Sequence, residues 1–286
     1  MANFPVIVSG LGAIAPGHDA LICDVWGVLH DGVRVHQDAV AALLQFRRRF
    51  GPVVLLSNAP RTIDALKEQF AKLGVPDDCY DAVVTSGIAA RADLATRARE
   101  SQLAMFHLGP ERDSGIYEGL AIDLVSPERA KIVLCTGLFD DDTETPEDYR
   151  ELLLSFSRRG LTFLCANPDI VVQRGGALIY CAGALAKVYA EMGGNVVYYG
   201  KPHPPIYKLV LEAAHAHAKG AIRRPLAVGD GLETDIRGAR NVGLDALFIA
   251  DGIHGEEVGD MSARSLAQLF ARTGLWPQAS MRSLVW

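Results

Sequence analysis

The stretch ICDVWGVLHDG, residues 22–32, sets a carboxylate at the end of an apolar run and follows it with a tryptophan and a glycine-containing turn. The apolar run has the composition of a buried strand, and Asp24 lies where that strand would end. A single Asp at a strand end is, by itself, more often a helix cap or a turn residue than a nucleophile. The rest of the chain must therefore show what Asp24 does, and why Trp26 stands two places after it.

Composition limits the class of protein. The chain has 286 residues, 49% of them hydrophobic, which is enough for one or two globular domains. Its net charge is −6, so we expect no nucleic-acid partner. No Lys or Arg precedes Arg34, and Pro5 and Pro16 interrupt the apolar N-terminal segment, so neither a signal peptide nor a membrane span is predicted. The five cysteines show no CxxC spacing and suit reduced, buried thiols, and we therefore expect a soluble, cytoplasmic protein.

Short β-branched runs alternate with longer helical patterns, which is typical of a parallel α/β sheet. The expected strands are 20–26, 52–58, 81–86, 225–230 and 245–250, and the expected helices between them are 38–50, 59–74, 204–220 and 233–243. In an open parallel sheet, ligands bind in the crevice at the carboxyl ends of the strands. Asp24, Ser57, Ser86 and Asp230 are therefore expected to converge on one site, although they lie far apart in sequence.

The middle of the chain has the pattern of a separate unit. Residues 104–200 contain strands and helices of their own, enough for a second α/β domain. The chain leaves the first sheet after about residue 86 and returns to it at GKPHPP, residues 200–205. We therefore expect a Rossmann-like core formed by residues 1–87 and 196–286, with an α/β domain inserted at 88–195.

Polar motifs at the expected strand ends suit phosphate chemistry. LLSNAP provides the hydroxyl of Ser57 and the amide of Asn58, which can hold phosphate oxygens together with loop amides. Lys201, just before a helix start, is a point charge that can neutralise a carboxylate or a phosphate. GDGLETD places Asp230 and Asp235 where their oxygens can bind a hard cation such as Mg²⁺. Each feature is weak alone, but as an ordered set on strand ends they are a strong signal.

These motifs resemble those of the haloacid dehalogenase superfamily, and within it the NagD-like class IIA branch, over almost the whole chain. DVWGVLHDG, LLSNAPR, GKPHPPIY and VGDGLETDIRGA are similar to its four sequence motifs. CANPD (165–169) and CAGALAK (181–187) are similar to the cap segments that face the active site in that branch. The resemblance implies a phosphatase whose large α/β cap is inserted between the second and third motifs.

The resemblance also implies a role for each site residue. Asp24 would attack phosphorus and form an aspartyl-phosphate, and Ser57 would hold the phosphoryl oxygens. Lys201 would steady both the nucleophile and the phosphate. Asp230 would bind Mg²⁺ together with Asp24, and Asp235 would stand beside the ion. Three further residues would contact or shape the substrate pocket: Asn58, Asn167 and Asp169.

Trp26 departs from the family pattern. Family members normally carry a second Asp here, which protonates the leaving oxygen and then helps to activate the hydrolytic water. An indole N–H is a donor that does not titrate in the useful range, so it can do neither. The backbone carbonyl of Trp26, which the resemblance makes a Mg²⁺ ligand, is retained. Because general acid–base help is worth about 10²–10⁴ in rate, we expect slow turnover of esters with poor leaving groups.

Three interpretations of Trp26 stay open. The protein is a weakened or inactive family member that binds a phosphorylated ligand, or it hydrolyses carbon–halogen bonds, where a halide leaving group needs no proton. Dehalogenases of the superfamily do not need the metal carboxylates that GDGLETD supplies. Alternatively, it is a working phosphatase that uses activated esters or another proton donor, for which His30 and Asp31 are the nearest titratable residues.

We therefore predict a Mg²⁺-dependent hydrolase of the haloacid dehalogenase type, acting on small phosphorylated metabolites through an aspartyl-phosphate. The main alternative is a protein of the same fold that binds a phosphorylated ligand without turnover. The sequence is also compatible with a homodimer formed through the cap.

Overall fold

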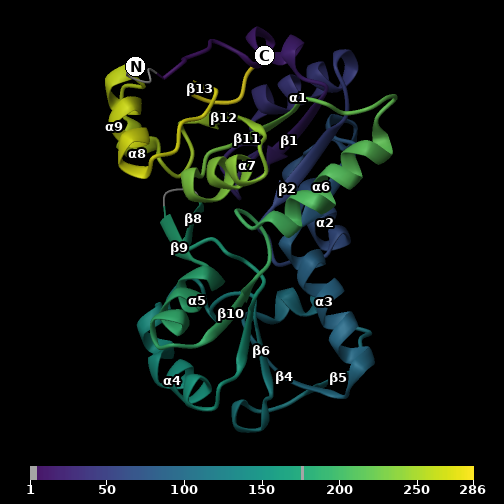
Figure 1. Cartoon of the computed structure of the whole chain (residues 1–286), viewed down its shortest axis with the longest axis vertical. Helices are drawn as coiled ribbons and strands as arrows, with labels where there is room; N and C mark the ends of the chain where they lie inside the picture. Colours follow the sequence, from purple (N-terminus) through teal and green to yellow (C-terminus); the bar gives the residue numbers. More distant parts are fainter. Residues whose placement is uncertain (1–4, 175–176) are drawn as a thin grey trace.

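The computed structural model describes residues 5–174 and 177–286. Two α/β units lie one above the other along the long axis of the molecule (Figure 1). The upper unit in this view is built from the N-terminal and C-terminal parts of the chain, and the lower unit from the middle part. The α/β fold with a Rossmann-like core expected from the sequence is confirmed.

The upper unit contains a six-stranded parallel sheet with the order β13-β12-β11-β1-β2-β3. Its strands are β1 (Ala20–Asp24), β2 (Val53–Ser57), β3 (Ala82–Thr85), β11 (Pro225–Gly229), β12 (Asp245–Ile249) and β13 (Ala279–Met281). The strand order reverses at β1, which lies between β2 and β11. Asp24 ends β1 and therefore stands at the switch point where open α/β sheets bind ligands.

Helices cover both faces of this sheet. They are α1 (Gln37–Arg49), α2 (Ile63–Leu73), α6 (Pro204–His217), α7 (Arg237–Asn241), α8 (Gly255–Val258) and α9 (Ala263–Thr273). Leu21 and Cys23 face one cluster, shared with α1 and α2, whereas Ile22 faces the cluster that contains α6. This alternation is the period-two pattern of a strand, and burial on both faces explains why β1 is apolar throughout.

The lower unit contains a five-stranded parallel sheet with the order β10-β7-β6-β4-β5. Its strands are β4 (Leu103–Leu108), β5 (Ile122–Leu124), β6 (Ile132–Cys135), β7 (Thr162–Cys165) and β10 (Asn195–Tyr198). The helices of this unit are α3 (Ser86–Glu100), α4 (Arg150–Arg158) and α5 (Ala182–Glu191). An antiparallel hairpin, β8 (Val171–Arg174) and β9 (Ala177–Tyr180), points from this unit towards the core (Figure 1).

The division into core and cap remains our proposal, with one boundary revised. α3 begins directly after β3 and packs its apolar side on the lower sheet, in keeping with a first crossing near residue 87. β10 pairs with β7 in the lower sheet, so a boundary at residue 196 would cut through a strand. We therefore place the second crossing after Tyr198, and the inserted cap includes all of β10.

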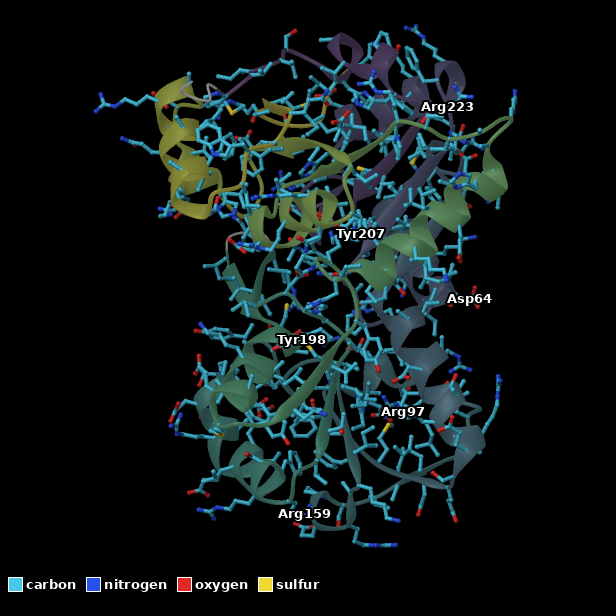
Figure 2. The ribbon with its side chains drawn as sticks, viewed as in Figure 1. Asp64, Arg97, Arg159, Tyr198, Tyr207 and Arg223 are labelled. Carbon is cyan, nitrogen blue, oxygen red and sulfur yellow. The ribbon has the colours of Figure 1, made fainter. Side chains whose placement is uncertain are left out.

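Most elements lie where the sequence predicts them, and the exceptions are short. The segment 233–243, expected as one helix, begins with a π-helical turn (Leu232–Ile236) and continues as α7. Tyr207 of α6, labelled in Figure 2, packs against Gly238 of α7, because a Cβ at Gly238 would stand 2.1 Å from the Tyr207 hydroxyl oxygen. The C-terminal strand β13 was not expected. All five cysteines are buried free thiols.

No helix in the part of the chain that the structure describes is long and apolar enough to cross a membrane.

Candidate active site

A pocket of about 740 Å³ lies between the core and the cap. The core contributes the ends of β1, β2 and β11, and the cap contributes the loop after β7 and the β8–β9 hairpin. Of the residues predicted for the site, the pocket wall includes Asp24, Trp26, Ser57, Asn58, Asn167, Asp169 and Asp230. The structure thus brings strand-end residues from distant parts of the sequence to one cavity.

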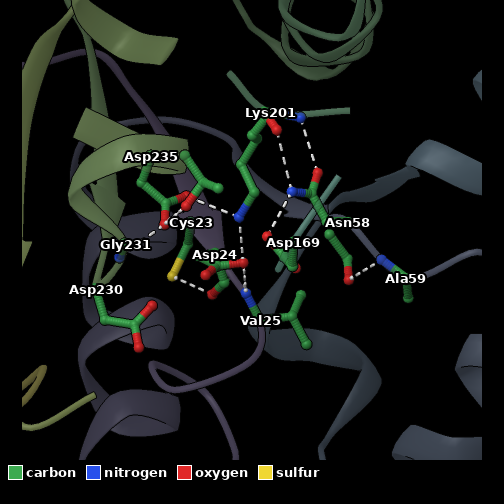
Figure 3. Close-up of polar contacts among 12 residues, drawn as sticks. Cys23, Asp24, Val25, Asn58, Ala59, Asp169, Lys201, Asp230, Gly231 and Asp235 are labelled. Atoms are coloured by element: carbon green, nitrogen blue, oxygen red, sulfur yellow. Dashed lines mark hydrogen bonds and ion pairs between the residues drawn. The ribbon is translucent and has the colours of Figure 1, made fainter. Parts of the chain in front are cut away.

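Lys201 links two carboxylates beneath this pocket. Its Nζ lies 2.5 Å from Oδ1 of Asp24 and 2.7 Å from Oδ1 of Asp235, and all three side chains are buried (Figure 3). The backbone N–H of Val25 also donates to Oδ1 of Asp24, at 2.7 Å. Both contacts use the same oxygen, so Oδ2 is the oxygen of Asp24 that is available to a ligand.

Asp230 completes a cluster of three buried carboxylates. Asp24, Asp230 and Asp235 each offer an oxygen, and these oxygens all lie within 4.8 Å of one another. The N–H of Ile253 donates to Oδ2 of Asp230 at 2.7 Å. A Cβ on Gly27 would stand 2.1 Å from that same oxygen, so the backbone of the β1 loop approaches Asp230 as closely as glycine allows.

The cluster carries more negative than positive charge. Burial, together with the neighbouring Asp235, raises the pKa of Asp24 well above its usual value despite the opposing Lys201. Burial and Asp235 likewise raise the pKa of Asp230 to about 7. Burial alone would lower the pKa of Lys201, but Asp235 and Asp24 raise it well above its usual value. Three carboxylates that share one ammonium are suited to a hard divalent cation, which binds carboxylate oxygens and neutralises the excess charge.

Ser57 and Asn58 follow β2 at the same edge of the sheet. Oγ of Ser57 accepts a hydrogen bond from the N–H of Ala59 at 3.1 Å, and because no group among the described residues accepts the hydroxyl proton, Ser57 can donate it to a ligand oxygen. The amide of Asn58 is instead committed to the protein. Its Nδ2 donates to Oδ1 of Asp169 at 2.9 Å, and its Oδ1 accepts from the N–H of Lys201 at 2.8 Å. In this structure Asn58 positions its neighbours, and its expected contact with substrate stays a prediction.

The cap loop after β7 brings Asn167 and Asp169 to the pocket. Oδ1 of Asn167 accepts from the N–H of Asp169 at 3.1 Å, which fixes the turn between them. Burial raises the pKa of Asp169, although Lys201 opposes the shift. Ser86, also expected at the site, binds the chain instead. Its hydroxyl lies 2.6 Å from the carbonyl of Ala166 in the same cap segment.

The side chain of Trp26 reaches across to the cap. Its Nε1–H donates to the carbonyl of Gln173 in β8, at 2.6 Å. The indole packs edge-on against the ring of His30, with the ring centres 5.2 Å apart. Position 26 therefore contributes an apolar surface to the pocket and no titratable group, and its one donor is used by the cap.

Neither of the two nearby titratable residues is placed as a ready proton donor. Burial lowers the pKa of His30 to about 4, so its ring is neutral at pH 7, and Nδ1 accepts from the N–H of Gly32 at 3.0 Å. Asp31 caps its own turn by accepting from the N–H groups of Val33 and Arg34. Although slight burial opposes it, these bonds hold the pKa of Asp31 below its usual value, so Asp31 is ionised at neutral pH.

One pair at the pocket was not predicted. Arg61 follows β2, and its Nε lies 3.4 Å from Oδ1 of Asp113 in the cap. Burial raises the pKa of Asp113 to about 6, while Arg61 opposes that shift. Arg61 belongs to the motif LLSNAPR, but Asp113 lies in ordinary polar sequence that carries no signal.

The sheet order, the inserted second sheet and the carboxylate–lysine cluster define a class of α/β hydrolase. The family described as haloacid dehalogenase-like hydrolase matches residues 18–243, and the chain belongs to this family. Its similarity to NagD also confirms the branch expected from the sequence.

Relatives and solved structures agree with this assignment. The ribonucleotide monophosphatase NagD of Escherichia coli (strain K12) is 30% identical over 236 residues, covering 82% of this chain and 88% of NagD. The crystal structure of a haloacid dehalogenase-like hydrolase from Brucella suis 1330 is 42% identical, with a TM-score of 0.87 over 98% of this chain and 100% of that one.

A third similarity concerns the fold alone. The structure of a glycerol phosphate phosphatase from Mycobacterium tuberculosis in complex with magnesium is 23% identical, with a TM-score of 0.65 over 94% of this chain and 76% of that one.

Proposed function

We propose that this protein is a Mg²⁺-dependent phosphatase of small phosphorylated metabolites. The observation that carries the proposal is the cluster in which Lys201 joins Asp24 to Asp235, with Asp230 beside them. The family and the phosphatase names of relatives such as NagD support the reaction class. The magnesium complex of the related fold supports the choice of metal.

Asp24 is the proposed nucleophile. Its Oδ2 forms a bond to phosphorus while the bond from phosphorus to the ester oxygen breaks, which leaves an aspartyl-phosphate and an alkoxide or phenoxide that then takes a proton from solvent. Water then attacks phosphorus, inorganic phosphate leaves, and the carboxylate of Asp24 is regenerated. Lys201 holds Oδ1 throughout, so the free oxygen keeps its direction, and Ser57 donates its hydroxyl proton to a phosphoryl oxygen.

Asp24, Asp230 and the backbone carbonyl of Trp26 are the proposed Mg²⁺ ligands, with Asp235 beside them. When bound, Mg²⁺ supplies the positive charge that lets an anionic carboxylate approach an anionic phosphate ester. The excess negative charge of the cluster is the feature of this chain that fits such an ion.

Trp26 sets the expected substrate preference. The indole has no titratable proton, and His30 and Asp31 are not placed as ready acids. The leaving oxygen therefore departs best when it needs no proton, as in phosphates of phenols or in acyl phosphates. The same observation favours the second candidate, a protein that binds a phosphorylated ligand without turnover, over an efficient general phosphatase. No observation in the described residues favours carbon–halogen hydrolysis.

The test is a panel of phosphorylated metabolites and p-nitrophenyl phosphate, assayed with and without Mg²⁺. We expect release of phosphate only with Mg²⁺, and none from Asp24→Asn, whose amide is nearly isosteric but cannot attack phosphorus. Wild-type turnover by Asp24→Asn would exclude the aspartyl-phosphate. If no ester is hydrolysed while phosphate binds in a Mg²⁺-dependent way, the binding protein is the better description. The homodimer and the cytoplasmic location stay predictions.

A further inference from the structure

The loop after β1 is built around the indole of Trp26. Gly32 lies beneath the ring, with φ at +85°, and a Cβ there would stand 2.6 Å from Cζ2 and Cη2 of the indole. Glycine is therefore required both by the backbone and by the ring. The N–H of Gly27 donates to the carbonyl of His30 at 2.8 Å, and Nδ1 of His30 accepts from the N–H of Gly32. These bonds fix the loop and hence the direction of the indole.

The residue that accepts the indole hydrogen bond, Gln173, lies on the β8–β9 hairpin of the cap. Gln173 belongs to β8, which pairs with β9 in a separate two-stranded sheet. Arg174 ties this hairpin to another cap loop, with its guanidinium 2.9 Å from Oδ2 of Asp141 and 3.1 Å from Oδ1 of Asp142. The hairpin is thus joined to the cap by charge and to the core by the Trp26–Gln173 hydrogen bond.

Both ends of this hydrogen bond line the pocket. Trp26, His30 and Gly32 form part of its core wall, and Val172, Gln173 and Tyr180 form part of the hairpin wall. The Trp26–Gln173 hydrogen bond therefore joins the core wall and the hairpin wall of the pocket where the proposed substrate binds. Because a two-stranded hairpin is only marginally stable alone, one well-placed hydrogen bond can decide its position.

We propose that Trp26 is a positioning residue whose indole N–H holds the β8–β9 hairpin closed over the pocket. An acidic side chain at this position would protonate the leaving oxygen, whereas the indole of Trp26 instead hydrogen-bonds to the cap. The closed hairpin narrows the pocket and excludes water from the site. The catalytic consequence rests on the proposed phosphatase function, but the closure itself does not.

Trp26→Phe tests the hydrogen bond, because phenylalanine keeps an aromatic ring and lacks the N–H. Trp276→Phe is the matched control, since Trp276 packs against Phe270 in the core and is not part of the pocket wall. We would measure amide hydrogen exchange in β8 and β9 by mass spectrometry. The hairpin amides of Trp26→Phe are expected to exchange about fivefold to tenfold faster, with those of β4 and β6 unchanged. Trp276→Phe is expected to leave the hairpin amides as in the wild type.

Kinetics with p-nitrophenyl phosphate and Mg²⁺ form the second arm. Loss of closure should lower kcat/KM mostly through a higher KM, because the hairpin holds substrate and does not touch the reacting atoms. Wild-type exchange rates in the hairpin of Trp26→Phe would overturn the proposal, and so would equal acceleration throughout the cap sheet. If the wild type hydrolyses nothing, the proposed function fails, while the exchange data still decide the role of Trp26.

A measurement on the wild type guards against a variant that does not fold. The chain has three tryptophans, so its ¹H–¹⁵N spectrum should show three indole signals, and Trp276→Phe and Trp286→Phe assign two of them. The remaining signal belongs to Trp26. Slow exchange of that indole proton with water supports the hydrogen bond to Gln173, and exchange as fast as in free indole overturns it.

Discussion

The side chain of Asn58 and the backbone of Lys201 hold each other through two hydrogen bonds across 143 residues of sequence. Oδ1 accepts from the N–H of Lys201 at 2.8 Å, and Nδ2 donates to its carbonyl at 3.2 Å (Figure 3). Gly200 makes room for this contact, since a Cβ there would stand 2.4 Å from Oδ1. The amide therefore sets the backbone from which the Lys201 ammonium reaches Asp24.

Replacing Asn58 should affect both stability and activity. Asn58→Ala leaves the N–H of Lys201 and an oxygen of Asp169 without their partner, at a cost of about 1–3 kcal/mol. Asn58→Asp should cost more, because a carboxylate would face two acceptors, the carbonyl of Lys201 and the carboxylate of Asp169. Urea unfolding gives the free energies, and kcat/KM should fall in the same order.

Asn195→Ala is the control, since Asn195 is an exposed residue of β10 and its replacement should change stability by less than about 0.5 kcal/mol. Equal stability of Asn58→Asp and Asn58→Ala would contradict the donor role of Nδ2.

Asp230→Asn should weaken Mg²⁺ binding. The amide keeps the shape of the side chain but removes a charge from the three-carboxylate cluster. Loss of a direct ligand should lower the affinity at least about tenfold, because even groups that only support ligands contribute about 10–100-fold. Isothermal titration calorimetry measures the change. Asp140→Asn, in the exposed acidic loop of the cap, should leave the affinity at its wild-type value, and unchanged affinity in Asp230→Asn would remove Asp230 from the site.

The main part of the candidate site could be predicted because its residues stand at strand ends. Parallel strands bring their carboxyl ends to one edge, so Asp24, Ser57 and Asp230 could be placed together before the structure was known. The order of the motifs along the chain added Lys201 and Asp235 to that group. These inferences need only the alternating strand and helix patterns and the motifs, and both can be read from short stretches of the sequence.

Contacts that depend on the placement of the cap could not be predicted. Trp26 and Gln173 are 147 residues apart, and nothing in either segment specifies the other. Asp113 has no sequence signal, although it lies against Arg61 at the pocket. The short strand β13 was missed because three residues at a sheet edge show no periodicity. In each case the partner is chosen by tertiary packing.

The buried carboxyl of Asp113 should make stability depend on pH. Burial raises its pKa in the folded protein from 3.8 to about 6, so the folded state holds the proton more tightly than the unfolded state. The resulting stabilisation is present below about pH 4 and is lost as the pH rises to about 6. Asp113→Asn has no such loss, so its stability relative to wild type should increase across this window, by at most about 3 kcal/mol.

Urea unfolding at several pH values from about 4 to 7 measures that difference. Asp123→Asn is the control, because Asp123 is an exposed residue of β5 in the cap, and its replacement should change the free energy of unfolding by less than about 0.5 kcal/mol. If the difference in unfolding free energy between Asp113→Asn and the wild type does not change with pH, Asp113 does not titrate in this window.

The leaving group should govern the rate because position 26 offers no acid. An aryl ester such as p-nitrophenyl phosphate can lose its oxygen unprotonated, whereas an alkyl phosphate cannot. We expect the wild-type rate for the alkyl ester to be about 10²–10⁴ lower than it would be with a general acid at position 26, and therefore well below the rate for the aryl ester. Trp26→Asp should raise the alkyl rate selectively, since the new carboxyl can donate a proton to the leaving oxygen. Steady-state assays with both esters at saturating Mg²⁺ measure the ratio.

The rates of Trp26→Asp can be interpreted only if the variant is folded and if the effect of losing the Trp26–Gln173 hydrogen bond is separated from the effect of the new carboxyl. Removing a large aromatic side chain from a core costs about 3–5 kcal/mol, and less is expected here because the indole is only partly buried. A thermal melt shows whether the variant is folded. The variant also lacks the Trp26–Gln173 bond, so a higher KM for both esters is expected, and rescue must be judged from kcat.

Similar alkyl and aryl rates in the wild type would mean that another residue already supplies the proton. A cap carboxyl such as Asp169 would then be the first residue to replace.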